Sequence, residues 1–103
     1  MFESIKKLLG FKITDYAQLV RDGAIILDVR SKGEYAGGHI RGSINISLDK
    51  LANNLPQLKK RNKPVITCCA SGMRSASAKS LLKSNGFTEV YNGGSWGSLQ
   101  NKI

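Results

Sequence analysis

The chain has 103 residues, of which 41% are hydrophobic and 22% are charged. This length allows one domain around a single core, and the ordinary composition excludes a disordered or low-complexity protein. The 16 Lys and Arg residues against 7 Asp and Glu residues give a formal net charge of +9, which raises the local concentration of small anions. No nucleic-acid motif accompanies this charge, so we expect no specific nucleic-acid partner.

Residues 1–12 carry apolar side chains at helical spacing, which predicts a helical N-terminal extension ahead of a domain over residues 13–103. The extension has no long apolar run and no small-residue cleavage site, so we expect neither a signal peptide nor a membrane partner. The only two cysteines, Cys68 and Cys69, are neighbours and cannot cross-link distant parts of the fold. The reducing cytoplasm is therefore the expected location.

The first half of the domain predicts two helices and two strands. Thr14 is placed to cap a helix over residues 15–21, which Gly23 can end. An apolar strand over residues 24–27 ends at Asp28. Ser31 and Glu34 have the spacing of a capping box and predict a short helix through residue 35, followed by a strand over residues 43–46.

The second half repeats this alternation. Leucines over residues 48–58 predict a helical face that Pro56 interrupts or bends. A buried strand over residues 65–68 precedes a helix over residues 74–85, with Gly86 as its C-terminal cap. A last strand over residues 88–91 is expected to turn at residues 92–94 into a short terminal helix.

Unbroken apolar runs, rather than alternating ones, are typical of parallel strands that are covered on both faces. The alternation of strands and helices predicts an open, mostly parallel α/β sheet with helices on both faces and right-handed crossovers. Sites in such sheets form beyond the carboxyl ends of the strands. Asp28 and Cys69 both occupy such ends.

Cys69 is the candidate nucleophile because it stands at a strand-to-helix turn. Backbone N–H groups and the positive end of the helix dipole favour an anion there, so we expect a thiolate near neutral pH. Gly72 allows a positive φ in the turn, and Arg74 offers a two-pronged donor to an incoming oxyanion. Ser71 and Ser75 can donate hydroxyl hydrogen bonds, and Ser75 can also cap the helix. The alternative is a small buried core residue.

Four blocks along the chain resemble the rhodanese (sulfurtransferase) family from about Thr14 onward. They comprise residues 26–30; residues 34–35 with 38–40 and 42–46; residues 69–75; and residues 86–87 with 90–91 and 93–94. The resemblance implies a single-domain rhodanese in which Cys69 takes sulfane sulfur from a small anionic donor such as thiosulfate and forms a persulfide. A thiol, cyanide or a protein then accepts the sulfur.

The resemblance also assigns the loop that binds the substrate. Its backbone amides would surround the persulfide, and its members are Ala70, Ser71, Gly72, Met73, Arg74 and Ser75. Ala70 stands where many family members have a charged or polar residue that helps to choose the donor. No cofactor is implied, and we expect a monomer.

Four side chains near the loop, those of Asp28, Arg30, Glu34 and His39, are expected to support the structure rather than to catalyse. Asp28 should accept loop or side-chain hydrogen bonds, and Arg30 is expected to pair with Glu34. His39, the only histidine, is more typical of a turn residue than of a general base, and one His with two adjacent Cys gives no metal-ligand set. Cys68 should point to the opposite side of its strand, in the core, with a resolving thiol as the alternative.

Two other functions remain open at this point. A cysteine phosphatase or arsenate reductase also places a thiolate and an Arg around an anion-binding loop, but four residues separate Cys69 from Arg74 here, one fewer than in the phosphatase loop. A non-catalytic rhodanese module for protein binding is the second alternative. Such modules often lack the loop cysteine.

Overall fold

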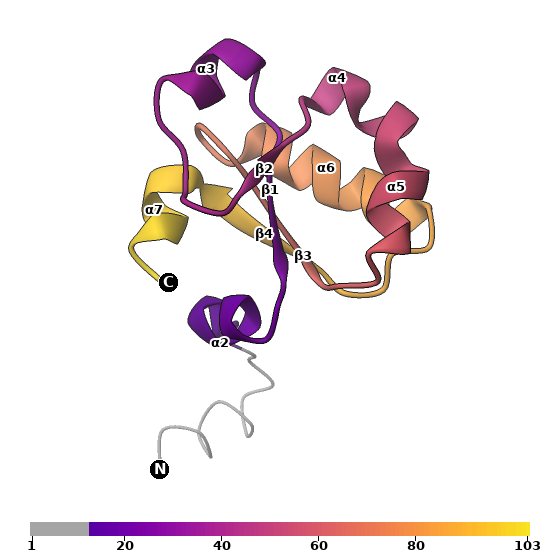
Figure 1. Ribbon diagram of the computed structural model, residues 1–103, viewed down its shortest axis with the longest axis horizontal. Helices are drawn as coiled ribbons and strands as arrows, with labels where there is room; N and C mark the ends of the chain where they lie inside the picture. Colours follow the sequence, from indigo (N-terminus) through magenta and orange to yellow (C-terminus); the bar gives the residue numbers. More distant parts are fainter. Residues whose placement is uncertain (1–12) are drawn as a thin grey trace.

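A computed structural model describes residues 13–103, which form a four-stranded sheet with helices on both of its faces (Figure 1). The strands are β1 (Ile25–Asp28), β2 (Ile44–Asn45), β3 (Val65–Cys69) and β4 (Val90–Ser95). All paired strands are parallel, in the spatial order β2-β1-β3-β4. The expected open α/β sheet is confirmed. The helical extension expected over residues 1–12 lies outside the described residues.

Short helices connect and cover the strands. They are α2 (Tyr16–Arg21), α3 (Lys32–Ala36), α4 (Leu48–Leu51), the 3-10 turn η1 (Ala52–Asn54), α5 (Leu55–Lys60), α6 (Met73–Ser84) and α7 (Trp96–Gln100). Within residues 13–103, no helix is long and apolar enough to cross a membrane.

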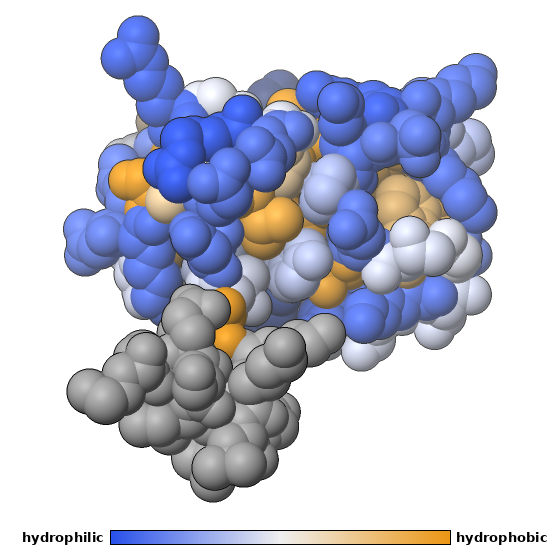
Figure 2. All heavy atoms as spheres, turned by 90° about the horizontal axis from the view of Figure 1, so that it is seen from below, coloured by the Kyte–Doolittle hydropathy of each residue, from blue (hydrophilic) through white to orange (hydrophobic). Residues whose placement is uncertain are grey.

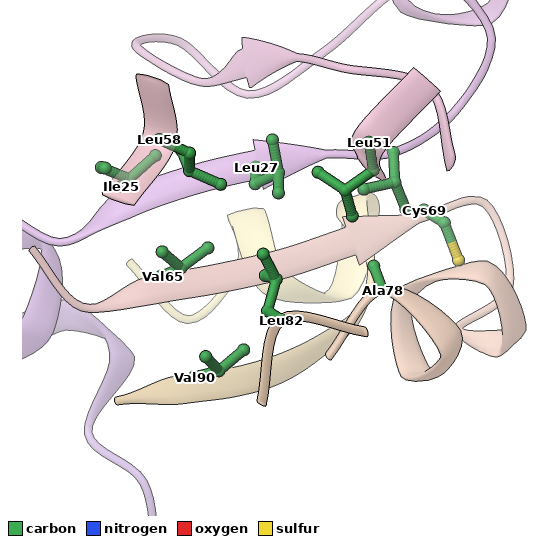
Figure 3. Close-up of a cluster of buried hydrophobic side chains, with 10 residues drawn as sticks. Ile25, Leu27, Leu51, Leu58, Val65, Cys69, Ala78, Leu82 and Val90 are labelled. Atoms are coloured by element: carbon green, nitrogen blue, oxygen red, sulfur yellow. The ribbon is translucent and has the colours of Figure 1, made fainter. Parts of the chain in front are cut away.

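The two faces of the sheet bury two separate apolar clusters. Leu27 and Val65 lie in the larger cluster, which is covered by side chains from α4, α5 and α6 (Figure 3). Ile26 and Ile66 lie in the smaller one, with side chains from α2 and α7. Successive residues of a strand point to opposite faces, and because both faces are covered, every residue of β1 and β3 is buried. Each such fully buried side chain contributes about 1.5–3 kcal/mol.

Most helix boundaries agree with the sequence signals, with two differences. The capping box of Ser31 and Glu34 is present at the start of α3, and Gly86 has a φ of +87° just beyond α6. Asp15, rather than Thr14, caps α2, because its carboxylate accepts the N–H of Gln18. Pro56 lies in the first turn of α5, where a missing N–H costs nothing, so it begins a new helix.

The last strand differs most from expectation, because β4 continues through residues 92–94 where a turn was predicted. A Cβ on Gly93 would lie 2.8 Å from the carbonyl oxygen of Thr67 and 2.9 Å from Leu99 Cδ2. Gly93 therefore permits close packing of β4 against β3 and α7, rather than a chain reversal. The register between β3 and β4 shifts between Thr67 and Cys69.

Figure 2 shows the surface seen from below Figure 1. Hydrophilic side chains cover most of the coloured surface in that view, and the apolar areas between them are small and separate. This distribution is typical of a domain whose apolar side chains are used in its core.

Candidate active site

Cys69 is the last residue of β3, and its sulfur lies beside the loop that leads into α6 (Figure 3). Its Sγ accepts the backbone N–H of Gly72 at 2.9 Å and that of Ser75 at 3.3 Å. Gly72 has a φ of +105° and forms the N-cap of the twelve-residue helix α6. Two amides and the start of a helix converge on one sulfur atom, an arrangement that favours negative charge there.

The thiol is nevertheless covered. Cys69 is 0% exposed and belongs to the larger apolar cluster, whereas Ala70, Ser71 and Met73 in the following loop are exposed. Sγ is therefore closed off from solvent in this conformation.

A buried polar network holds the start of α6 against the sheet. The hydroxyl of Ser75 lies 2.7 Å from that of Thr67 and donates to Asn92 Oδ1 at 2.6 Å. Asn92 Oδ1 also accepts the N–H of Gly94 at 2.9 Å. Ser75 is thus a buried residue inside α6 and not its cap, because Gly72 occupies that position. Sequence reasoning missed Thr67 and Asn92, which lie inside β3 and β4, and their polar character was the only signal.

Arg74, five residues after Cys69, makes a two-pronged ion pair with Glu34 of α3. Its Nη1 donates to Glu34 Oε1 at 2.7 Å and its Nη2 to Oε2 at 3.0 Å. Both side chains are 38% exposed. The Arg74 guanidinium, together with the amide and hydroxyl of Ser31, lowers the pKa of Glu34 to about 2. The expected pairing of Arg30 with the Glu34 carboxylate is wrong, since Arg74 occupies it.

Arg30 instead pairs with Asp28 inside the protein. Its Nη2 lies 2.7 Å from Asp28 Oδ2 and its Nε 2.9 Å from Oδ1, and the residues are 4% and 0% exposed. Nη2 also donates to the carbonyl of Gly38 at 2.7 Å, while Nη1 reaches the backbone carbonyl of Glu34 at 3.4 Å. The guanidinium carbon lies 4.9 Å from the ring centre of Trp96. The pair therefore ties the end of β1 to α3 and α7.

His39 lies in the turn after α3. Its ring stacks on that of Tyr35 with 3.7 Å between ring centres, and its Nδ1 lies 2.7 Å from the Tyr35 carbonyl oxygen. A hydrogen bond to this carbonyl requires the proton on Nδ1. His39 is thus a satisfied turn residue, as its sequence context indicates.

Cys68 points away from Cys69 into the smaller apolar cluster, and both thiols are free. Burial, followed by the nearby Asp28 carboxylate, raises the pKa of Cys68 to about 12. The core placement expected for Cys68 is confirmed. Such a thiol is protonated at neutral pH and is a poor nucleophile.

A cavity of about 330 Å³ opens beside Arg74. It is lined by Val29, Ser31, Ser47, Leu48, Asp49 and Arg74. Arg74 is the residue of the loop after Cys69 that lines this cavity, and Cys69 itself does not line it. Across residues 13–103, no group of three or more His, Cys, Asp or Glu side chains could hold a metal ion.

Comparison with known proteins agrees with this arrangement. A sequence model of the rhodanese-like domain matches residues 12–97. The uncharacterized protein YqhL of Bacillus subtilis (strain 168) is 41% identical over 69 residues, which cover 67% of this chain and 54% of YqhL. The thiosulfate sulfurtransferase GlpE of Pseudomonas fluorescens (strain SBW25) is 36% identical over 78 residues, covering 75% of this chain and 71% of GlpE.

Solved structures give the same relationship in three dimensions. A rhodanese from E. coli with bound anions superimposes with a TM-score of 0.69 at 30% identity, over 74% of this chain and 91% of that protein. The chain thus spans most of this rhodanese but only about half of the length of YqhL.

Proposed function

Because the chain belongs to the rhodanese-like domain family, we propose that it is a sulfurtransferase that carries sulfane sulfur on Cys69. The donor is thiosulfate, a persulfide or a polysulfide, and the acceptor is a thiol, cyanide or a protein. The observation that carries the proposal is the convergence of the Gly72 and Ser75 amides on Cys69 Sγ at 2.9 and 3.3 Å. The similarity to GlpE supports the choice of reaction.

The first half-reaction is a displacement at sulfur. The Cys69 thiolate attacks the outer sulfur of thiosulfate, the S–S bond of the donor breaks, and its electron pair leaves with sulfite. The product is a Cys69 persulfide anion, which carries the charge of the original thiolate one atom further out. In the second half-reaction an acceptor nucleophile attacks this outer sulfur, and the Cys69 thiolate leaves. No external oxidant or reductant is consumed.

The loop has two roles in this proposal. The amides of Gly72 and Ser75 stabilise the anion on Sγ before transfer, and the exposed part of the loop moves to admit the donor. Ala70, Ser71 and Met73 then face the donor, and Arg74 stands at the entrance. Asp28, Arg30, Glu34 and His39 hold the surrounding turns in place. We further propose that the protein acts as a cytoplasmic monomer.

The test is turnover of thiosulfate with cyanide, measured as thiocyanate. Wild type and Cys68→Ala should both produce thiocyanate, whereas Cys69→Ser should not. Cys68→Ala is the matched control because it removes the neighbouring thiol and leaves the loop unchanged. Full turnover in Cys69→Ser would refute the proposal.

Aryl-phosphate hydrolysis is measured beside it to test the phosphatase alternative. We expect no Cys69-dependent phosphatase turnover, because a loop with one residue fewer brings its amides onto a single sulfur rather than around a phosphate group. Phosphatase turnover faster than sulfur transfer, and lost in Cys69→Ser, would favour the phosphatase. Neither activity in a folded protein would favour the binding module.

A further inference from the structure

The Arg74–Glu34 ion pair bears on which sulfur donor the site accepts. Arg74 is the one cation within residues 69–75. A sulfonate group would bind it through two parallel N–H donors, which is also how the Glu34 carboxylate binds it, at 2.7 and 3.0 Å. Glu34 therefore occupies the place of the oxyanion, and thiosulfate must displace a carboxylate to use this arginine.

The first turn of α3 holds the Glu34 carboxylate in place. The Ser31 amide donates to Glu34 Oε1 at 3.1 Å and the Ser31 hydroxyl at 3.0 Å, while the Glu34 amide donates back to the hydroxyl at 3.2 Å. This capping box fixes the carboxylate before any substrate arrives. Displacing Glu34 from Arg74 thus leaves a carboxylate close to an entering dianion, which opposes its binding.

The cavity beside Arg74 suits a donor that carries an organic group better than it suits thiosulfate. Val29 and Leu48 give it apolar walls, and Met73, next to Arg74, is 80% exposed. Lys32 and Lys50 line an adjoining hollow with Ser47, so the wider surroundings remain cationic. The discrimination against an oxyanion therefore comes from the occupied guanidinium and not from the net charge.

From these contacts we infer that Glu34 is a specificity-determining residue: by occupying Arg74 it disfavours thiosulfate and favours a persulfide carried on an organic thiol or on a protein. This inference rests on the sulfurtransferase function proposed above. The Cys69 thiolate attacks the outer sulfur of R–S–SH, the donor's S–S bond breaks, and R–S⁻ leaves with the electron pair. The hydrogen of the donor stays on the sulfur now bonded to Cys69.

The experiment compares two donors, thiosulfate and the persulfide of an aminoalkyl thiol, which has no oxyanion group. Steady-state KM and kcat are measured for wild type, Glu34→Gln and Glu89→Gln. Gln at position 34 can keep the capping box while it loses the charge. Glu89 is an exposed carboxylate just before β4, at the other end of the sheet from Cys69, so Glu89→Gln controls for net charge.

We expect Glu34→Gln to lower the KM for thiosulfate about tenfold, with kcat changed by less than about twofold, because a charge-assisted two-pronged pair no longer competes. Kinetics with the aminoalkyl persulfide should change by less than about twofold. Glu89→Gln should leave both donors unchanged. The gain with thiosulfate should also shrink at high salt, which a merely structural effect would not do.

Equal changes for both donors in Glu34→Gln, or an unchanged KM for thiosulfate in a variant with wild-type thermal unfolding, would overturn the role of Glu34. A wild-type protein that prefers thiosulfate tenfold in kcat/KM would overturn the donor preference. Failure of the wild type to take sulfur from either donor is a different result, and it would overturn the proposed function and this inference with it.

Discussion

Replacing Asp28 by Asn tests how strongly the buried ion pair holds the end of the sheet beside the site. The Asp28 carboxylate accepts hydrogen bonds from Arg30 Nη2 at 2.7 Å and from Arg30 Nε at 2.9 and 3.1 Å, and it is 0% exposed. Asparagine keeps one acceptor oxygen, but it leaves the Arg30 charge without a counter-ion in a site that is only 4% exposed. Because an arginine side chain stays protonated in proteins, the guanidinium cannot escape this cost by losing its proton.

Removing one partner of a buried pair costs about 3–5 kcal/mol. We expect about 3 kcal/mol for Asp28→Asn, the lower end of that range, because the amide oxygen of Asn retains a hydrogen bond to Arg30. Urea unfolding should show a lower midpoint with an unchanged m-value. The exposed carboxylate variant Asp22→Asn is the control and should change the free energy of unfolding by less than about 0.5 kcal/mol. A loss below about 1 kcal/mol in Asp28→Asn would refute this reasoning.

Three further outcomes are expected. Gly93→Ala should destabilise the fold by about 1–3 kcal/mol in urea unfolding, because its Cβ would lie 2.8 Å from the Thr67 carbonyl oxygen, and a neutral effect would contradict the close packing of β4. Cys68, whose pKa is raised to about 12, should resist iodoacetamide at pH values near 8 in folded Cys69→Ser and react after unfolding; rapid labelling of Cys68 in that folded variant would contradict its burial. The pKa of Glu34 falls from 4.5 to about 2, so its pairing stabilises the folded state above pH 4.5 and is lost as the pH falls toward 2; stability in Glu34→Gln should therefore depend less on pH in that window, and an unchanged pH profile would contradict the pairing.

The architecture could be predicted because local patterns carry it. Three local signals identify their elements from residues that are close together in the sequence. They are the apolar runs of β1 and β3, the capping box at Ser31 and the glycine after α6. The position of Cys69 at the turn between a strand and a helix could be predicted on the same grounds, because it is a local feature.

Long-range pairings could not be predicted in the same way. Glu34 and Arg74 are 40 residues apart, and nothing local distinguishes Arg74 from Arg30 as the partner of Glu34. The pair Gly93–Gly94 predicts a turn, because glycine pairs are typical of turns. In the structure Gly93 lies inside β4, where it allows β3, β4 and α7 to approach closely. The sequence offers Ser75 as a possible helix cap, because its buried partners cannot be recognised locally. Thr67 and Asn92 lie in β3 and β4, 8 and 17 residues away in the chain.

Intact-protein mass after incubation with a sulfane donor tests whether Cys69 is the sulfur carrier. Wild type and Cys68→Ala should each gain one sulfur atom, peptide mapping should place it on Cys69, and a reducing thiol should remove it. Cys69→Ser should gain none. Loading retained in Cys69→Ser, or found on Cys68 in the wild type, would contradict the account.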